Sequence, residues 1–250
     1  MTQTVLKTDR AVLKIGSLPR VVGTICSFQN GFPLSSRQVP SDIIEVRLDM
    51  MPRSPWLEKS QSIQAVGVPV ILTIRLQKEG GKWSDLDQRR VPIYAQALEH
   101  LAAVDVEFHS DIVHEISAKA KELGKACILS YHDFEKTPPI AHLRDVISRA
   151  QKLGSIVKVS TMVHRADDIQ TLESLLRDQW DVPICVIGMG ALGTETRVSF
   201  AASGSCLTYG YLSPEPSAPG QLPVAELVAR LRSVSKSFDE DYTRRKGVLQ

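Results

Sequence analysis

The chain has 250 residues and a mass of 27.6 kDa, a length that α/β barrels commonly occupy as a single domain. Its composition is 43% hydrophobic and 23% charged, which excludes a disordered, collagenous or low-complexity chain. The 30 basic and 28 acidic residues give a net charge of +2. So small an excess argues against a partner that is a nucleic acid or a membrane surface.

The first residues carry Lys7, Arg10 and Lys14 but no apolar core of signal-peptide length. The longest charge-free stretches are shorter than the ~18 residues of a membrane-spanning helix. The four cysteines lie far apart without a CxxC pair, which favours buried reduced thiols over disulfides or zinc ligands. We therefore expect a cytoplasmic protein.

Short β-branched apolar runs recur eight times along the chain, and most segments between them have helical spacing. The predicted strands are 21–27, 43–49, 70–76, 104–108, 127–131, 156–160, 184–187 and 206–211. The predicted helices are 85–101, 110–123, 139–153, 166–177, 193–203 and 222–234. Eight strand–helix units in about 250 residues predict an α/β fold of the (β/α)8 TIM-barrel type, with a doubly wound open sheet as the alternative.

No proline- or serine-rich linker divides the chain, so residues 1–250 are expected to form a single domain. Residues 1–20 precede the first unit and could form a small hairpin that closes the bottom of the barrel. Residues 239–250 are polar and are expected to form a frayed end.

Charged side chains interrupt several of the predicted strands at a period of two. In the strand 43–49, Glu45, Arg47 and Asp49 alternate with apolar residues and therefore share one face. Four other strands place polar pairs in the same way: Thr73 and Arg75, Asp105 and Glu107, Ser130 and His132, and Lys158 and Ser160. One such pair could mark a strand end that emerges into water. Five of them predict a charged pocket at the mouth of the barrel, which binds a small polyhydroxylated or anionic molecule.

Lys158 is the strongest candidate for covalent chemistry because it lies in an apolar strand without an acidic neighbour in sequence. Burial disfavours an ammonium group and nearby arginines repel it, so both effects favour the neutral amine. A neutral amine that faces a ketone forms a Schiff base, which acidifies the adjacent carbon. The alternative is a lysine held in an ion pair with Glu107 or Asp49.

His132, at the end of its strand, is the candidate proton carrier, although a packed polar histidine is the alternative. The loop after the third strand supplies Glu79, followed by Gly80 and Gly81, which allow the backbone to turn back over the mouth. A carboxylate in that loop could bind one nitrogen of His132 and select its tautomer.

Two further motifs have weaker functional interpretations. Gly188, Gly190 and Gly193 form a GxGxxG pattern, with Glu215 at a superficially suitable distance. The pattern opens the seventh unit instead of the first, so we expect a tight turn or a phosphate-binding loop in preference to a nicotinamide site. Arg197, which follows it, could bind a phosphate or a carboxylate.

A cluster of His109, Asp111, His114 and Glu115 matches no zinc spacing. Residues of this kind at the start of a helix are more often cap and first-turn residues. We therefore expect no metal site.

Taken in order, the motifs resemble those of type I 3-dehydroquinate dehydratase, the lysine-dependent enzyme family of the shikimate pathway. They are EVRLD at 45–49, TIRLQKEGGKW at 73–83, SYHDFEKTP at 130–138, VKVSTM at 157–162, GMGALGTETR at 188–197, GSCLTYG at 204–210 and SAPGQ at 217–221. Small departures are Tyr209, where the family commonly has Phe, and Thr196, where Ser is usual. The segment between Arg197 and SAPGQ is one residue longer than in similar sequences.

The resemblance implies a role for nine residues. The Schiff-base lysine falls on Lys158, the general acid/base on His132 and its carboxylate partner on Glu79. The remaining positions bind the substrate: Glu45, Arg47 and Arg75 contact its hydroxyl groups, and Arg197, with Ser217 and Gln221, contacts its carboxylate.

The implied reaction is the syn elimination of water from 3-dehydroquinate, which gives 3-dehydroshikimate. The resemblance implies no metal and no other cofactor, a role in aromatic amino acid biosynthesis, and a homodimer. Two other functions stay open from the residues alone. One is a Schiff-base aldolase that acts on a phosphorylated keto substrate, and the other is a barrel that binds a metabolite without catalysis.

Overall fold

A computed structural model describes residues 3–28, 39–51 and 55–247 of the chain. The predicted strands are confirmed, with ends that shift by one to three residues. The strands are β1 Thr4–Lys7, β2 Val12–Ile15, β3 Arg20–Ile25, β4 Ile43–Arg47, β5 Val70–Thr73, β6 Ala103–Glu107, β7 Ala126–Asp133, β8 Ile156–Met162, β9 Ile184–Met189, β10 Leu207–Tyr211 and β11 Leu222–Pro223.

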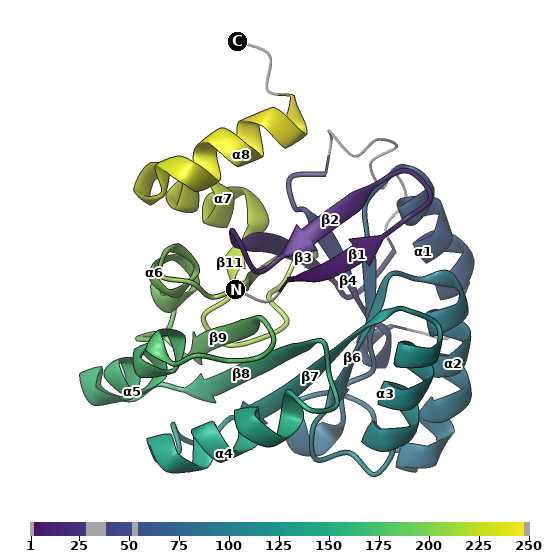
Figure 1. The fold of residues 1–250 in the computed structure, drawn as a ribbon, viewed down its shortest axis with the longest axis horizontal. Helices are drawn as coiled ribbons and strands as arrows, with labels where there is room; N and C mark the ends of the chain where they lie inside the picture. Colours follow the sequence, from purple (N-terminus) through teal and green to yellow (C-terminus); the bar gives the residue numbers. More distant parts are fainter. Residues whose placement is uncertain (1–2, 29–38, 52–54, 248–250) are drawn as a thin grey trace.

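The strands β3 to β10 form a curled parallel sheet (Figure 1). Each strand from β3 to β8 pairs with the next along the chain, and β10 pairs with β3. The curl brings β9 beside β10, where the backbone N–H of Cys206 donates to the carbonyl of Ile184 at 2.8 Å. The predicted (β/α)8 barrel is therefore confirmed. The carboxyl ends of all these strands point to the same mouth, where barrels of this kind hold their active sites.

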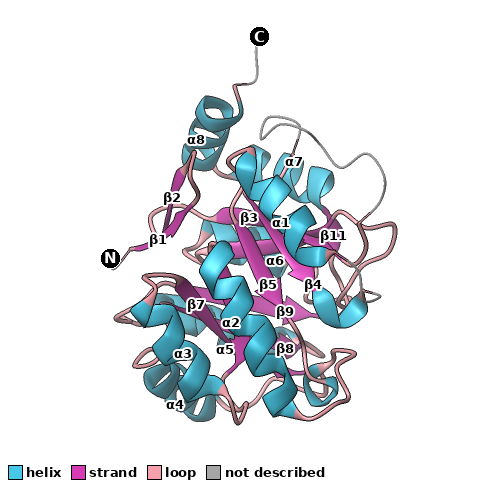
Figure 2. Ribbon diagram, turned by 90° about the vertical axis from the view of Figure 1, so that its right-hand side faces the viewer, coloured by secondary structure: helices cyan, strands magenta, loops and turns pink. Residues whose placement is uncertain are grey.

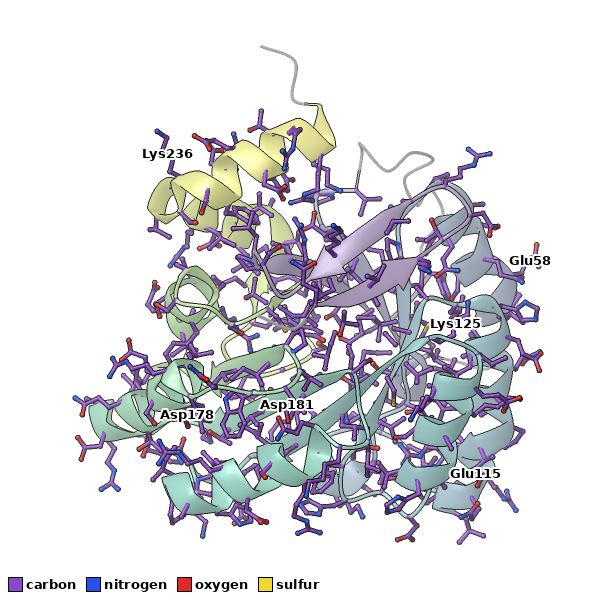
Figure 3. All side chains as sticks on the ribbon, in the orientation of Figure 1. Glu58, Glu115, Lys125, Asp178, Asp181 and Lys236 are labelled. Carbon is purple, nitrogen blue, oxygen red and sulfur yellow. The ribbon has the colours of Figure 1, made fainter. Side chains whose placement is uncertain are left out.

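Helices cover the outside of the sheet (Figure 2). They are α1 Trp56–Ala65, α2 Val91–His100, α3 Val113–Glu122, α4 Ile140–Ala150, α5 Ala166–Arg177, α6 Thr196–Ala202, α7 Val224–Val234 and α8 Lys236–Lys246. Each predicted helix is present, and α1 is an addition that the sequence pattern did not indicate. Charged side chains such as Glu58, Glu115 and Lys236 point away from the barrel (Figure 3). Within the described residues, no helix combines the length and the apolar character that a membrane crossing requires.

The N-terminal segment forms the expected hairpin, since β1 and β2 pair antiparallel with Thr4 opposite Ile15. It lies across the amino ends of the barrel strands (Figure 1). Leu6 and Ile15 are fully buried there, in one apolar cluster with barrel residues such as Ile43 and Ile156. The hairpin thus closes the bottom of the barrel with apolar side chains.

The expectation of a frayed polar end after residue 238 is wrong for its described part, because residues to Lys246 form α8. The helix is polar overall, but Phe238 and Tyr242 lie one turn apart and are both buried. Asp241 on the same face accepts hydrogen bonds from Arg20 at the barrel and from Arg245. A few well-spaced contacts therefore dock a helix that its mean composition does not predict.

Candidate active site

One cavity lies at the mouth of the barrel, and its space, including the opening to solvent, is about 510 Å³. It is lined by Thr24, Glu45, Arg47, Arg75, Glu79, Gly80, His132, Phe134, Lys158, Ser160, Ile187, Met189, Arg197, Tyr209, Ser217, Ala218 and Gln221. All nine site residues that the sequence predicted are in this set, although they come from six different segments of the chain. Cavities with convergent ionisable groups are the usual place for catalysis.

Lys158 is buried in the middle of β8, with 5% of its surface exposed. Its Nζ lies 2.6 Å from Oδ2 of Asp105 on β6 and 4.6 Å from the centre of the Tyr209 ring. The alternative of an ion pair with Glu107 or Asp49 is wrong in its partner, because Asp105 takes that place. A carboxylate and an aromatic face at these distances both interact favourably with a positive charge. Lys158 nevertheless lines the cavity, whereas Asp105 is fully buried and is not part of the lining.

Asp105 is the centre of a buried network. Its Oδ1 accepts hydrogen bonds from Arg75 Nη2 and from Ser130 Oγ, each at 2.6 Å. Burial alone would raise the pKa of Asp105, but the positive charges of Arg75 and Lys158 hold it well below its usual range. The carboxylate is therefore ionised and cannot accept the proton of Lys158 at any ordinary pH.

Glu107, on the same strand and fully buried, extends the network outward. It contacts Arg75 at 3.3 Å and Arg90 at 2.7 Å, and Arg90 in turn binds Asp87. Each cation of this network is thus matched by a carboxylate, which stabilises charges inside a protein. These ion pairs hold the guanidinium of Arg75 in place.

His132 and Glu79 form the second pair of the site. Oε2 of Glu79 lies 3.0 Å from Nδ1 of the imidazole and also accepts a hydrogen bond from the backbone N–H of His132 at 3.2 Å. Within the described part of the chain, Nε2 has no hydrogen-bond partner, and the ring lines the cavity. With the proton on Nδ1 directed at the carboxylate, Nε2 is left as the basic nitrogen that faces the cavity.

Burial shifts both partners away from their charged forms. It raises the pKa of Glu79 to about 7, a rise that the nearby Arg75 opposes and Glu107 reinforces. Burial also lowers the pKa of His132 well below its ordinary value, and the positive charges of Arg75 and Lys158 lower it further. His132 is therefore neutral at physiological pH and can accept a proton.

The loop after β5 reaches this pair because of two glycines. Gly80 has a φ of 76°, and a Cβ atom there would lie 2.2 Å from the ring of Phe134. At Gly81 a Cβ atom would lie 2.0 Å from the carbonyl oxygen of Arg75. Only glycine satisfies both positions, so the loop turns back over the mouth as the sequence predicted and carries Glu79 to the histidine.

Arg197, in the first turn of α6, is 2% exposed and has no carboxylate partner among the described residues. Its three nitrogens donate only to backbone carbonyls, those of Tyr209, Pro219 and Gly220, at distances between 2.9 and 3.2 Å. Burial lowers the pKa of this guanidinium to about 10, which still leaves it charged. A buried cation without an anion on its own chain is the most direct sign of an anionic ligand.

The loop that follows β10 is bound to the loop that follows β9. Gly220 has a φ of 71°, and a Cβ atom there would lie 2.4 Å from the carbonyl oxygen of Gly190. The side-chain oxygen of Gln221 accepts from both N–H and Oγ–H of Ser217, at 2.8 and 2.9 Å. The glycine pattern at 188–193 thus serves close packing of two loops, as the expected tight turn.

Glu45 and Arg47 on β4 also line the cavity. Glu45 accepts hydrogen bonds from Thr24 and Thr73, both at 2.8 Å, and is 4% exposed. Arg47 forms a bidentate ion pair with Asp49 at 2.9 and 2.8 Å. Carboxylate and guanidinium side by side present both an acceptor and donors to hydroxyl groups.

The sequence reasoning did not assign a site role to Asp105 or Tyr209. Asp105 was visible as a charged residue in an apolar strand, but nothing local identified Lys158 as its partner. Tyr209 was noted only as a departure from the family pattern. The histidine cluster near residue 109 has packing contacts, for example His109 with Phe108 at 4.9 Å between ring centres. Across the described residues, no group of three or more His, Cys, Asp and Glu side chains is arranged to hold a metal ion.

Comparisons with known proteins agree on one family. A family model described as Type I 3-dehydroquinase matches residues 34–237. The 3-dehydroquinate dehydratase of Methanococcus vannielii is 35% identical over 189 residues, which are 74% of this chain and 85% of that protein. That of Methanocella arvoryzae is 32% identical over 216 residues, 86% of this chain and 96% of the relative.

Solved structures give the same result for the fold. The 3-dehydroquinate dehydratase of Geobacillus kaustophilus superposes with a TM-score of 0.77 at 22% identity, over 92% of this chain and 96% of that one. The enzyme of Enterococcus faecalis superposes with a TM-score of 0.74 at 26% identity, over 88% of this chain and 96% of that one.

Proposed function

Because the chain belongs to the type I 3-dehydroquinase family, we propose that it dehydrates 3-dehydroquinate through a Schiff base on Lys158. Its enzyme class is that of a hydro-lyase, which removes water across a carbon–carbon bond. The mechanism below assigns a task to each group of the cavity. The observation that carries it is the meeting of Lys158, neutral His132 and unpaired Arg197 in one cavity.

The first step converts the ammonium of Lys158 into a nucleophile. Asp105 cannot take the proton because its own pKa is held far too low, so neutral His132 accepts it. The free amine attacks the C3 ketone of the substrate, and the carbonyl electron pair moves to oxygen. A proton passes from nitrogen to that oxygen, and the protonated histidine then helps it to leave as water. The product is a protonated imine and a neutral histidine.

The charge next to Asp105 is the same before and after this step. The site starts with an ammonium ion and ends with an iminium ion at nearly the same place. The carboxylate at 2.6 Å and the ring of Tyr209 at 4.6 Å therefore stabilise both species. Fixed groups that match the charge of the intermediate need no reorganisation during the reaction.

The second step is the elimination. His132 removes the proton from C2, and the iminium accepts the electron pair to form a neutral enamine. The C1 hydroxyl then leaves as water with the proton from the same histidine, so both events take place on one face of the substrate. Glu79 stabilises the transient imidazolium through its contact with Nδ1. Hydrolysis of the imine releases 3-dehydroshikimate and restores the lysine.

Arg197 binds the substrate carboxylate, which is the anion that its carbonyl-only surroundings lack. Ser217 and Gln221 also line the cavity and supply additional polar contacts. Glu45 and Arg47 bind the hydroxyl groups of the ring. Arg75 has its donors directed at Asp105, Ser130 and Glu107, so its main task is to hold Asp105 against Lys158.

Two assays test this proposal. Incubation with 3-dehydroquinate should produce the ultraviolet absorbance of a conjugated enone, which carbon–carbon cleavage by an aldolase would not. Borohydride added during turnover should reduce the imine, and peptide mass mapping should locate the adduct on Lys158. The exposed Lys152 provides a control, because Lys152→Met should leave both results unchanged. An adduct on another lysine, or none in an active enzyme, would refute the mechanism.

A further inference from the structure

The ring of Tyr209 is in contact with the amine of Lys158, the proposed nucleophile. It belongs to β10, is 4% exposed and lines the cavity, and Nζ of Lys158 lies over the face of its ring, 4.6 Å from the centre. The strand β10 completes the barrel between β9 and β3. The side chain of Tyr209 therefore points into the barrel, toward the charged side chains around Lys158.

The hydroxyl of Tyr209 is buried and has no hydrogen-bond partner in the described part of the structure. Two other buried tyrosines differ in this respect. Tyr94 donates to the carbonyl of Asp105 at 2.8 Å, and Tyr242 donates to the carbonyl of Pro40 at 2.8 Å. Because buried hydroxyl groups are normally paired, one that has no partner among the described residues, on a side chain that lines a cavity, points to a ligand as its partner.

This hydroxyl can act only as a hydrogen-bond donor or acceptor and not as an acid. Burial raises the pKa of Tyr209 well above its ordinary value, and the carboxylates of Glu45 and Asp105 raise it further. The phenol therefore keeps its proton throughout catalysis. Glu45, Asp105, Cys185 and Cys206 act electrostatically on this phenol, and the amine of Lys158 lies over its ring. A phenol that keeps its proton is a donor, which suits an oxygen that gains negative charge.

The position of Nζ limits where such an oxygen can be. The hydroxyl lies at the rim of the ring over which Nζ is held, yet it makes no hydrogen bond with Nζ. A carbon atom that bonds to Nζ, and the oxygen on that carbon, would therefore lie beside this ring.

We propose that the hydroxyl of Tyr209 donates a hydrogen bond to the ketone oxygen of the substrate and to the carbinolamine oxygen formed from it. This inference rests on the proposed Schiff-base function. When the amine forms its bond to C3, the carbonyl electron pair moves to oxygen, and Tyr209 stabilises that developing charge without transferring its proton. The proton that the oxygen takes comes from the nitrogen, and His132 supplies the one with which it leaves as water. When the product imine is hydrolysed, the same hydroxyl orients the attacking water.

The inference predicts that Tyr209 affects imine formation more than elimination. Tyr209→Phe keeps the ring beneath Lys158 and removes only the hydroxyl. We expect rapid mixing followed by a borohydride quench to show adduct formation slowed by roughly 10–100-fold, which is the effect of losing one donor to a developing oxyanion. The isotope effect with substrate deuterated at C2 should fall toward unity, because the step before C–H cleavage has become slow.

Tyr242→Phe is the matched control, since it removes the same atom from a buried tyrosine beside α8, far from the mouth. The two variants should change the melting temperature in opposite directions. Tyr209→Phe removes an unpaired buried hydroxyl and should raise the melting temperature by about 2–4 °C, whereas Tyr242→Phe breaks a hydrogen bond and should lower it by a similar amount. Only Tyr209→Phe should slow the adduct.

Wild-type adduct kinetics in Tyr209→Phe, with an unchanged isotope effect, would overturn the inference. A melting temperature below that of the wild type would also overturn it, because the hydroxyl would then have a structural partner such as a bound water. Failure of the Schiff-base proposal itself has a different signature, since the wild type would then form no adduct on Lys158 at all.

Discussion

At the end of the barrel covered by the β1–β2 hairpin, the inward side chains are apolar, and two residues further along the same strands they are polar or charged. The strand β8 passes from Ile156 to Lys158, and β4 passes from Ile43 to Glu45. Ile43 and Ile156 are fully buried in one apolar cluster, whereas Glu45 and Lys158 line the cavity. Inward positions recur every second residue along a strand. The same strands therefore carry a lower layer of apolar side chains at the hairpin end and an upper layer of polar side chains at the cavity.

The two layers are stabilised in different ways. The lower one gains free energy from apolar burial and close packing, which needs no particular partner. Many buried charges of the upper one are matched, as Asp105 matches Lys158 and Arg75. Among the described residues, the guanidinium of Arg197 has no carboxylate partner, and Nε2 of His132 and the hydroxyl of Tyr209 have no hydrogen-bond partner. We propose that a ligand pairs with these three groups. The site is thus identified by its incomplete pairing more than by its charge.

The largest effect on activity is expected from removal of the amine at the centre of the upper layer. Lys158→Met should reduce kcat by about 10⁴-fold or more, the scale seen when a covalent nucleophile is lost. Product absorbance measures the rate, and no adduct should be trapped by borohydride. An unchanged rate would mean that another residue is the nucleophile.

Loss of the proton carrier ranks second. His132→Ala should lower kcat by roughly 10²–10⁴-fold, which is the usual contribution of a positioned general base. The imine should still form slowly with water as the proton acceptor, so borohydride should trap an adduct on Lys158. A variant with wild-type turnover would assign proton transfer to a different group.

Glu79→Gln should have a smaller effect, roughly 10–100-fold in kcat, because a positioning group contributes less than the base it orients. It should also change the pH profile. The pKa of Glu79 is raised to about 7, so the carboxylate that supports His132 is present above that pH and lost below it. Wild-type kcat should therefore rise from about pH 6 to pH 8, with an apparent pKa near that of Glu79. This rise should be absent from Glu79→Gln, and its persistence would assign the rise to another residue.

Arg197→Met should mainly weaken binding. The substrate carboxylate persists through the reaction, so its contact stabilises the ground state and the transition state alike. The expected loss is about 2 kcal/mol, or roughly 30-fold in KM, with kcat close to that of the wild type. Steady-state kinetics with 3-dehydroquinate separate the two constants, and a fall confined to kcat would contradict this role.

The smallest effect on activity is expected in the lower layer, where stability should respond instead. Leu6 of the hairpin is fully buried against the barrel bottom. Leu6→Ala should lower the free energy of unfolding by about 2–5 kcal/mol through cavity formation. The kcat per folded molecule should be unchanged. Denaturant titration measures the free energy of unfolding. The rate divided by the number of active sites trapped with borohydride gives kcat per folded molecule. A parallel loss of kcat would show that the two layers are coupled.

The order of the strands, the barrel and the face of each strand that carries charge could be predicted from the amino-acid sequence. These features are local, because a period of two residues fixes the face and helical spacing fixes the segments between. The loop with Gly80 was also predictable, since only glycine fits a left-handed turn against Phe134. The positions of Lys158 and His132 in one cavity followed from the convergence of strand ends in any parallel barrel, whereas the place of Arg197 followed from the family resemblance.

The tertiary structure alone decided which groups meet across the barrel. Asp105, and not Glu107 or Asp49, pairs with Lys158 because the stagger of the strands sets which residues share a layer, and stagger is not encoded in any one segment. The docking of α8 is decided in the same way, by a few contacts with residues far away in sequence. The carbonyl surroundings of Arg197 and the unpaired hydroxyl of Tyr209 likewise depend on loops and strands that only the folded chain brings together.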